Sequence, residues 1–496
     1  MVHVGGHADS LPELIQSVLS THPSLRSQQA QGESAAQALE SARWQFYPTP
    51  SIGLEQVDTS TQDPNYPSYG DKNVTTVRLQ QPLWTAGRLT AGLDKAQAGV
   101  LASQATLENI RQDLALRVVQ VVSDWYGGWL KGQALDKSLQ YHQTLREQIL
   151  RRIANGVSPQ SDLTLLLGRQ QQTEADLSAA LAQEQGALAR LIQMLGHALP
   201  PHALVHSLGA APTLDTNARD LMEHAQAQHP SVIKLQAQAR MAEAEIIELR
   251  ASLSPELYLR AERQYGNYTV ANSAPVNRYF LGFSSNFGAG LSSLSQVGGA
   301  QARYAAALAD IDSTRVSLGE EIQADYAQAE AGLVRLDALR ASLSSSDNLA
   351  KAWSRQFIAG RKTWLDVMNA VREEAQLETQ IADAKASQLL LSWRLAIVGR
   401  GLDRALDQAS AALSKAPVTQ TTPATPAHST ADAFSDLNWE TSGQLPLYAQ
   451  DGAEAIALRQ DAHIDPLHLG LHLGLGTRVG PAAAPYAGHT RKEDAW

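Results

Sequence analysis

The spacing of apolar and polar residues changes in the same order twice along the chain, which predicts two copies of one structural unit. Residues 11–46 are rich in Ala, Gln, Glu, Leu and Ser, a composition that favours a helix. Pro48 and Pro50 end this helix, because proline cannot continue it. Residues 51–57 and 74–84 are extended and partly alternating, so we expect two strands there.

The second half predicts the same elements, and its strand at 278–287 shows two distinct faces. Tyr279, Leu281 and Phe283 share one face with Phe287. The other face carries Arg278, Gly282, Ser284 and Asn286, with Phe280 as an exception. An apolar and a polar face over about ten residues fit a transmembrane β-strand whose apolar side meets lipid. The alternative is an amphipathic strand in a soluble sheet.

Each strand pair is followed by a long segment without proline, over residues 87–155 and 291–359. About 70 helical residues would form a rod on the order of 100 Å. In the first rod, Leu114, Val118, Val121 and Trp125 have the spacing of a coiled-coil seam. Gly127 and Gly128 interrupt this pattern.

Return helices are expected over residues 159–195 and 362–412, so each half reads helix, strand, strand, long helix, tight tip, long helix. Gly156 and Gly360 are expected to be turn residues with positive φ.

A direct alignment supports the duplication. Residues 22–48 and 229–255 align without a gap, both begin with His-Pro-Ser, and nine of the 27 pairs are identical. Four strands per chain would leave two open sheet edges, which hydrocarbon does not tolerate. Several chains must then pool their strands. A trimer would supply twelve, whereas the eight strands of a dimer would enclose little or no channel.

These features together resemble the outer-membrane efflux (TolC-like) family. The residues that carry the resemblance are the two His-Pro-Ser helices, Gln-Pro-Leu-Trp-Thr-Ala-Gly at 81–87 with a weaker echo at 287–290, and tip sequences at 155–162 and 357–370. The resemblance implies a mainly α fold with a small β part, in which long helical hairpins and four strands per chain form a homotrimer. Its twelve strands would make an outer-membrane β-barrel that continues as a helical periplasmic tunnel.

The resemblance also implies a function, a location and partners. The protein would be the passive exit duct of a tripartite efflux or type I protein secretion system. It would lie in outer-membrane lipid and work with a periplasmic adaptor (membrane fusion) protein and an inner-membrane pump or ABC transporter. The second tip, Gly-Arg-Lys-Thr-Trp-Leu-Asp-Val at 360–367, is most similar to the type I secretion branch, and multidrug efflux is the competing assignment.

In the family, acidic rings and a latch between the two tips close the periplasmic entrance. Asp366 matches a ring carboxylate, whereas the second ring position is Asn369 here. Asp162 and Ser161 match the acceptor side of the latch. A competing interpretation is that both aspartates are helix N-terminal acids favoured by the helix dipole.

The donor side of the latch departs from the family. Lys362 stands where the family often has Arg, and Phe357 where it often has Tyr. Phenylalanine cannot donate a hydrogen bond and lysine cannot make a planar bidentate one, so we expect a weaker or different latch.

Composition narrows the other function classes. A net charge of −10 with scattered Lys and Arg gives no reason to expect nucleic-acid binding. The sequence contains no stretch of eighteen apolar residues, so it predicts no transmembrane helix. Nucleotide-binding, zinc-protease and hydrolase motifs are missing, so we expect no enzyme, cofactor or metal. The alternative function is a soluble or periplasmic long coiled-coil adaptor or scaffold, which would not account for the amphipathic strands.

We therefore divide the chain as follows. Residues 1–10 are an N-terminal extension without an evident signal peptide, so the signal was removed, the start lies upstream, or the protein is not exported. Residues 11–199 form the first repeat, 200–213 a linker and 214–416 the second repeat. Residues 417–496 are rich in Thr, Pro, Ala and Ser at their start and are expected to be a low-complexity, disordered tail.

Overall fold

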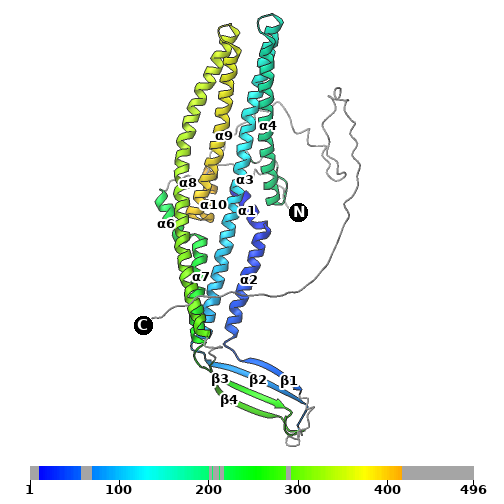
Figure 1. The fold of residues 1–496 in the computed structure, drawn as a ribbon, viewed down its shortest axis with the longest axis vertical. Coiled ribbons are helices and arrows are strands. Elements are labelled where there is room, and N and C mark those ends of the chain that lie inside the picture. Colours follow the sequence, from blue (N-terminus) through cyan, green and yellow to red (C-terminus); the bar gives the residue numbers. More distant parts are fainter. Residues whose placement is uncertain are drawn as a thin grey trace, which may run out of the picture. The chain divides into compact units, whose positions relative to one another are not determined.

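The computed structural model describes residues 10–56, 70–199, 204, 212, 217–285 and 292–415. Within them the two halves share the order helix, helix, strand, strand, long helix, return helix, and the second half adds α10 (Figure 1). The first repeat contains α1 (Leu11–Thr21), α2 (Pro23–Trp44), β1 (Thr49–Gln56), β2 (Asn73–Trp84), α3 (Arg88–Ala154) and α4 (Gln160–Leu195). The second contains α6 (Ala218–Gln228), α7 (Pro230–Ala251), β3 (Glu256–Tyr265), β4 (Val276–Ser284), α8 (Ser292–Ile358), α9 (Trp364–Arg400) and α10 (Leu402–Lys415). The predicted tail, most of the extension and most of the linker lie outside these ranges.

The helix predicted over residues 11–46 is in fact two helices, because the chain turns at His22. This residue is extended, with φ −66° and ψ 130°, and its Nδ1 accepts a hydrogen bond of 3.3 Å from the amide of Ser24. Proline follows as the first helical residue, where its missing N–H costs nothing. His229 and Ser231 repeat the same cap at 3.3 Å. The His-Pro-Ser motif is therefore a helix start, which explains its presence in both repeats.

The last return helix also differs from the prediction. It ends at Arg400, because Gly401 has φ +91°, and α10 begins immediately after it. None of the helices in the described part of the chain combines the length and apolar character needed to cross a membrane.

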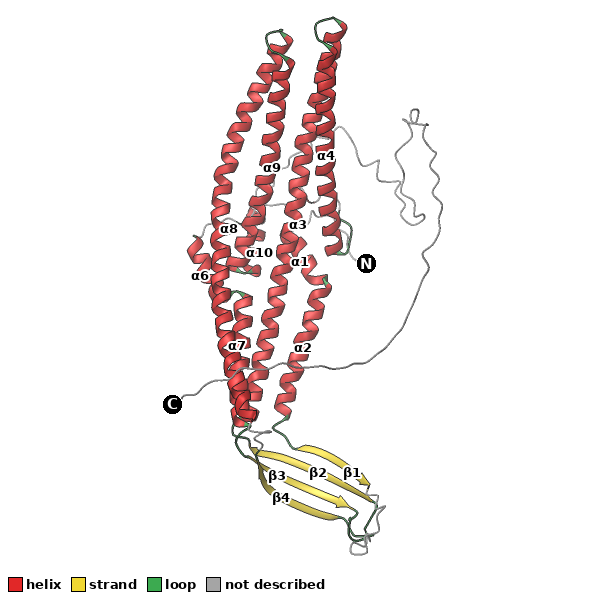
Figure 2. Ribbon diagram, viewed as in Figure 1, coloured by secondary structure: helices red, strands yellow, loops and turns green. Residues whose placement is uncertain are grey.

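The four strands form one antiparallel sheet in the order β1-β2-β3-β4, so the two repeats meet at the pairing of β2 with β3 (Figure 2). Tyr279, Leu281 and Phe283 share one face and are 78%, 69% and 78% exposed. The other face is polar, with an ion pair of 2.6 Å between Arg78 and Glu262. β1 and β4 are the two edges of the sheet in the chain.

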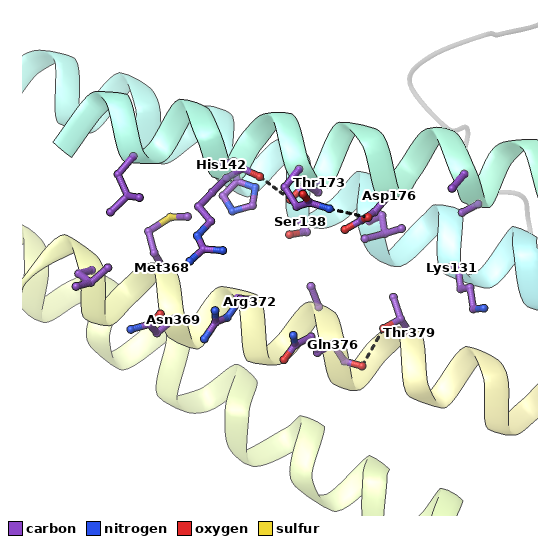
Figure 3. A pocket seen from close by; sticks show the side chains of 18 of the residues that line it. Lys131, Ser138, His142, Thr173, Asp176, Met368, Asn369, Arg372, Gln376 and Thr379 are labelled. Atoms are coloured by element: carbon purple, nitrogen blue, oxygen red, sulfur yellow. Dashed lines mark hydrogen bonds between the residues drawn. The ribbon is translucent and has the colours of Figure 1, made fainter. Parts of the chain in front are cut away.

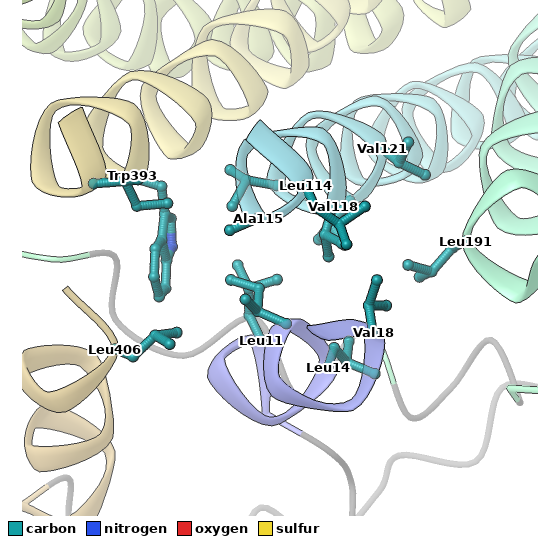
Figure 4. Close-up of a cluster of buried hydrophobic side chains, with 14 of the residues drawn as sticks. Leu11, Leu14, Val18, Leu114, Ala115, Val118, Val121, Leu191, Trp393 and Leu406 are labelled. Carbon is teal, nitrogen blue, oxygen red and sulfur yellow. The ribbon is translucent and has the colours of Figure 1, made fainter. Parts of the chain in front are cut away.

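The largest core lies where α1, α3, α4, α9 and α10 meet (Figure 4). The predicted seam of α3 is buried there, and Trp125 is fully covered. Trp393 of α9 and the apolar face of α1 complete this core. A buried Trp or Leu side chain contributes on the order of 1.5–3 kcal/mol relative to exposure, so this cluster stabilises the junction of both repeats.

α3 continues as a helix through Gly127 and Gly128, which the sequence pattern suggested as interruptions. Gly128 is required by close packing: a Cβ there would lie 2.9 Å from the backbone nitrogen of Glu184 and 3.3 Å from the carbonyl oxygen of Ala180. At this position, α3 and α4 can therefore approach as closely as they do only because residue 128 has no side chain.

Candidate gate at the helical tips

The two hairpins end in the same turn. Gly156 and Gly360 have φ of +71° and +72°, the conformation expected for turn glycines. In each turn the amide that follows the glycine donates to the carbonyl five positions earlier, at 2.8 Å in the first hairpin and 2.9 Å in the second. This bond satisfies a carbonyl at the end of the ascending helix. In both hairpins the N-cap of the return helix comes three residues after the glycine.

The return helices start differently. In α9, the Thr363 hydroxyl accepts from the amide of Asp366 at 3.2 Å, and the Asp366 carboxylate accepts from the Thr363 amide at 3.2 Å and hydroxyl at 2.8 Å. These bonds, helped by Lys362 at 3.8 Å, hold the pKa of Asp366 below its usual value. In α4 the N-cap is Pro159, which offers no side-chain cap, and the equivalent Asp162 makes no side-chain hydrogen bond or ion pair among the described residues.

Phe357 lies in a small apolar core that both tips share, and it is only 3% exposed. The buried members of this core are Leu145, Ile149, Leu166, Phe357, Val367, Met368 and Val371. The guanidinium of Arg152, from α3, lies 4.7 Å from the Phe357 ring centroid, and Lys362 Nζ lies 4.4 Å from the ring centroid of Trp353. Each such cation–π contact contributes roughly 0.5–1 kcal/mol at an exposed site.

Apolar packing and the Arg152–Phe357 contact join the tips within one chain. Over residues 145–170 and 350–372, no hydrogen bond or ion pair connects the two hairpins. The structure brings Lys362 and Asp366 together, but Ser161 and Asp162 make no hydrogen bond to the second tip. Asn369, one turn after Asp366 on α9, lines a cavity between the hairpins. The pore and latch roles of these residues stay predictions.

Ion pairs that the sequence did not predict connect α3 to α9 further from the tips. Lys137 contacts Glu374 at 2.7 Å and Glu378 at 2.6 Å. Burial acts to lower the pKa of Lys137, but its bonds to the two glutamates outweigh burial and raise it. The only sign of these ion pairs in the sequence was that Glu374 and Glu378 are four residues apart, which places them on one face of a helix. Their partner lies more than 230 positions away and could not be inferred from local pattern.

The cavity lies between α3 and α4 on one side and α9 on the other, with a volume of about 540 Å³ (Figure 3). His142 reaches it from α3, and Asn369, Arg372 and Gln376 project toward it from α9. His142 is 3% exposed and its Nδ1 has no partner. Burial lowers the pKa of His142, which favours the neutral form of its side chain. Sequence reasoning missed this cavity.

A family model described as outer membrane efflux protein matches residues 14–197 and 221–397, more than half of the chain. No curated protein matches the sequence significantly. Several solved structures share the fold. The outer membrane protein VceC from Vibrio cholerae has a TM-score of 0.68 and 18% identity, over 78% of this chain and 95% of that one.

Two further structures are similar to the same extent. For the CmeC outer membrane channel of Campylobacter jejuni the TM-score is 0.67 and the identity 15%, over 79% of this chain and 85% of that one. For the open state of the MtrE outer membrane channel of Neisseria gonorrhoeae the TM-score is 0.63 and the identity 17%, over 80% of this chain and 90% of that one. The chain therefore belongs to the outer membrane efflux protein family and is a non-enzymatic outer-membrane channel whose long helices extend into the periplasm.

Proposed function

We propose that three copies of this chain close their sheets into one twelve-stranded wall and their helices into a single duct. The observation that carries this proposal is the sheet itself. It has one exposed apolar face, one polar face and two edges, β1 and β4, that have no partner strand in the described part of the chain. Pairing β4 of one copy with β1 of the next satisfies both edges, which is a requirement in a membrane.

The duct works in a tripartite assembly, with a periplasmic adaptor and an inner-membrane pump or ABC transporter supplying cargo and energy. The sequence of the second tip, residues 360–367, supports export of proteins by the type I route, and multidrug efflux is the alternative. Reconstitution with either kind of inner-membrane complex would distinguish the two cargoes.

The tips form the gate of this duct. In this structure Phe357 joins the two hairpins through the shared apolar core and its contact with Arg152. Ser161 and Asp162 have no bond to the second tip of their own chain, so they are available as acceptors for a neighbouring copy. Asp366, at the start of α9, would face the pore as an acidic ring, whereas Asn369, one turn on at the second ring position of the family, lines the cavity between the hairpins of its own chain.

Single-channel recording in planar bilayers tests the gate. Truncation of Phe357 to alanine removes a fully buried aromatic side chain, a change that costs about 3–5 kcal/mol where packing is tight. We expect Phe357→Ala to raise open probability strongly and Arg152→Ala to raise it less. Arg151→Ala is the matched control, because Arg151 is exposed and its side chain has no partner among the described residues. Equal open probability in all three variants would contradict a gate at this contact.

A further inference from the structure

The cavity between the hairpins has charged groups that the gate does not use. Arg169 of α4 and Arg372 of α9 line it from opposite sides. Neither guanidinium makes a hydrogen bond, ion pair or ring contact among the described residues. Both are exposed to solvent, so their charge is not neutralised within the chain.

Two further charged side chains, Lys131 and Asp176, line the cavity. Lys131 forms an ion pair with Asp383 at 2.7 Å. Asp176 is the only carboxylate in the lining, and it accepts from the side-chain amide of Gln172 at 3.0 Å. On α9, Asp366 and Glu373 both lie outside the lining of the cavity. Asp366 is bound to Thr363 and Lys362, and Glu373, next to Arg372 in the sequence, is exposed. The Gln172 amide is neutral and does not cancel the charge of Asp176, so the two arginines and Asp176 leave the lining with an excess of one positive charge.

The rest of the lining is both apolar and polar. Leu135, Trp364 and Met368 give it an apolar wall, and the amides of Asn369 and Gln376 lie among them. A volume of about 540 Å³ lies within the range of about 300–1,000 Å³ that is typical of small-molecule sites. The buried His142 side chain, with its unpartnered Nδ1, adds an unsatisfied polar atom to one wall.

We propose that this cavity binds amphiphilic organic anions, small molecules that join a carboxylate, sulfonate or phosphate group to an apolar body. The anionic group lies between Arg169 and Arg372, whose planar guanidinium groups suit bidentate contact with such oxygens. The apolar body packs against Trp364 and Met368. The inference extends the proposed function, since it gives the duct a binding step for anionic cargo next to its gate.

Calorimetric titration of the purified full-length trimer tests the proposal with three naphthalene probes of matched shape. We expect 2-naphthoate to bind, the cation 2-naphthylmethylammonium not to bind, and neutral naphthalene-2-methanol to bind more weakly than the anion. Inorganic phosphate at the same concentration should not displace naphthoate, because it lacks the apolar body.

Variants then assign the site. Each of Arg169→Gln and Arg372→Gln should weaken naphthoate binding about tenfold, the typical effect of losing one charge-assisted hydrogen bond. Arg335→Gln on the exposed surface of α8 is the control and should bind as the wild type does. Gln376→Trp should also weaken binding, since it fills the cavity without removing a charge.

Three results would overturn the proposal: equal binding of the anionic and cationic probes, unchanged naphthoate affinity in a variant that combines Arg169→Gln with Arg372→Gln, or displacement of naphthoate by phosphate alone. Trimer migration on gels shows whether each variant is assembled. If the wild-type trimer conducts normally but does not bind naphthoate, the proposed site is wrong and the proposed duct still holds. If the wild-type trimer binds naphthoate but does not conduct in bilayers, the duct is wrong and the site still holds.

Discussion

At the scale of single residues, Asp366 shows how one carboxylate can be explained by local structure before any pore is assembled. Its oxygens accept from Thr363, and Lys362 lies at 3.8 Å. This arrangement agrees with the interpretation of Asp366 as a helix N-terminal acid. The same residue could still form a ring in the trimer, but as a carboxylate that is already hydrogen-bonded and partly neutralised.

The cap of α9 gives the first prediction. Thr363→Ala removes a helix cap that is typically worth about 1 kcal/mol, so exchange of the Asp366 amide with solvent should become about fivefold faster. Ser161→Ala, at the uncapped start of α4, should leave exchange there unchanged. Hydrogen exchange with mass spectrometry measures both.

The same cap has a defined pH dependence. The pKa of Asp366 is lower in the folded protein than in the unfolded chain. The carboxylate therefore stabilises the start of α9 fully above the ordinary aspartate pKa of about 4, and this stabilisation is lost as the pH falls through the folded pKa. We expect the start of α9 to be equally protected from pH 8 to pH 5 and to loosen below pH 4. Loosening between pH 7 and pH 6 would point to another group.

At the scale of elements, the sequence predicted most boundaries but not how the helices meet. Proline and glycine mark ends by their own backbone preferences, so the tips at Gly156 and Gly360 and the strand starts after Pro48 were visible locally. The break at His22 was missed because histidine is an uncommon cap. The cavity could not be predicted, because Arg169 and Arg372 are brought together only by the packing of separate hairpins.

The close approach of α3 and α4 at Gly128 predicts that a change from glycine to alanine destabilises the protein there but stabilises it at Gly168. Gly128→Ala would place a Cβ 2.9 Å from backbone, so it should lower the melting temperature of the trimer. Gly168→Ala has no atom within 4 Å of the new Cβ and should raise stability by about 0.5–1 kcal/mol, because alanine is the better helix former. Circular dichroism melts would compare them; a stabilising Gly128→Ala would show that α4 can move away.

The sheet faces give a second prediction at this scale. Leu281→Arg places a charge on the exposed apolar face and should block assembly, at a cost of about 2–4 kcal/mol near the membrane midplane. Ser284→Arg, on the polar face, should assemble and change conductance. Trimer yield and single-channel recordings measure the two effects, and equal behaviour of the variants would mean that the faces are assigned wrongly.

At the scale of the whole molecule, the duplication extends to the lengths of three pairs of helices. α1 and α6 both have 11 residues, α2 and α7 both have 22, and α3 and α8 both have 67. The repeat was visible in sequence from the His-Pro-Ser alignment alone. A trimer of such chains would have approximate sixfold symmetry in its helices.

Truncation after Ala416 tests which part of the chain is needed for assembly. All the described helices end by Lys415, so the shortened protein should still form a detergent-requiring trimer in the outer-membrane fraction. Light scattering of the purified protein measures its mass. A stable, detergent-free monomer would contradict the assembly, and loss of membrane insertion would show that residues 417–496 contribute to it.

The unequal starts of α4 and α9 have a consequence for where motion begins. The cap formed by Thr363 favours an intact first turn of α9 by about 1 kcal/mol over the uncapped start after Pro159. The first turn of α4 is then unwound about five times as often as that of α9. Around a trimeric entrance the starts of α4 and α9 would alternate, so each uncapped start of α4 would lie between two capped starts of α9. Thermal opening would be confined to three separated points, and the ring could loosen locally without losing its circular closure.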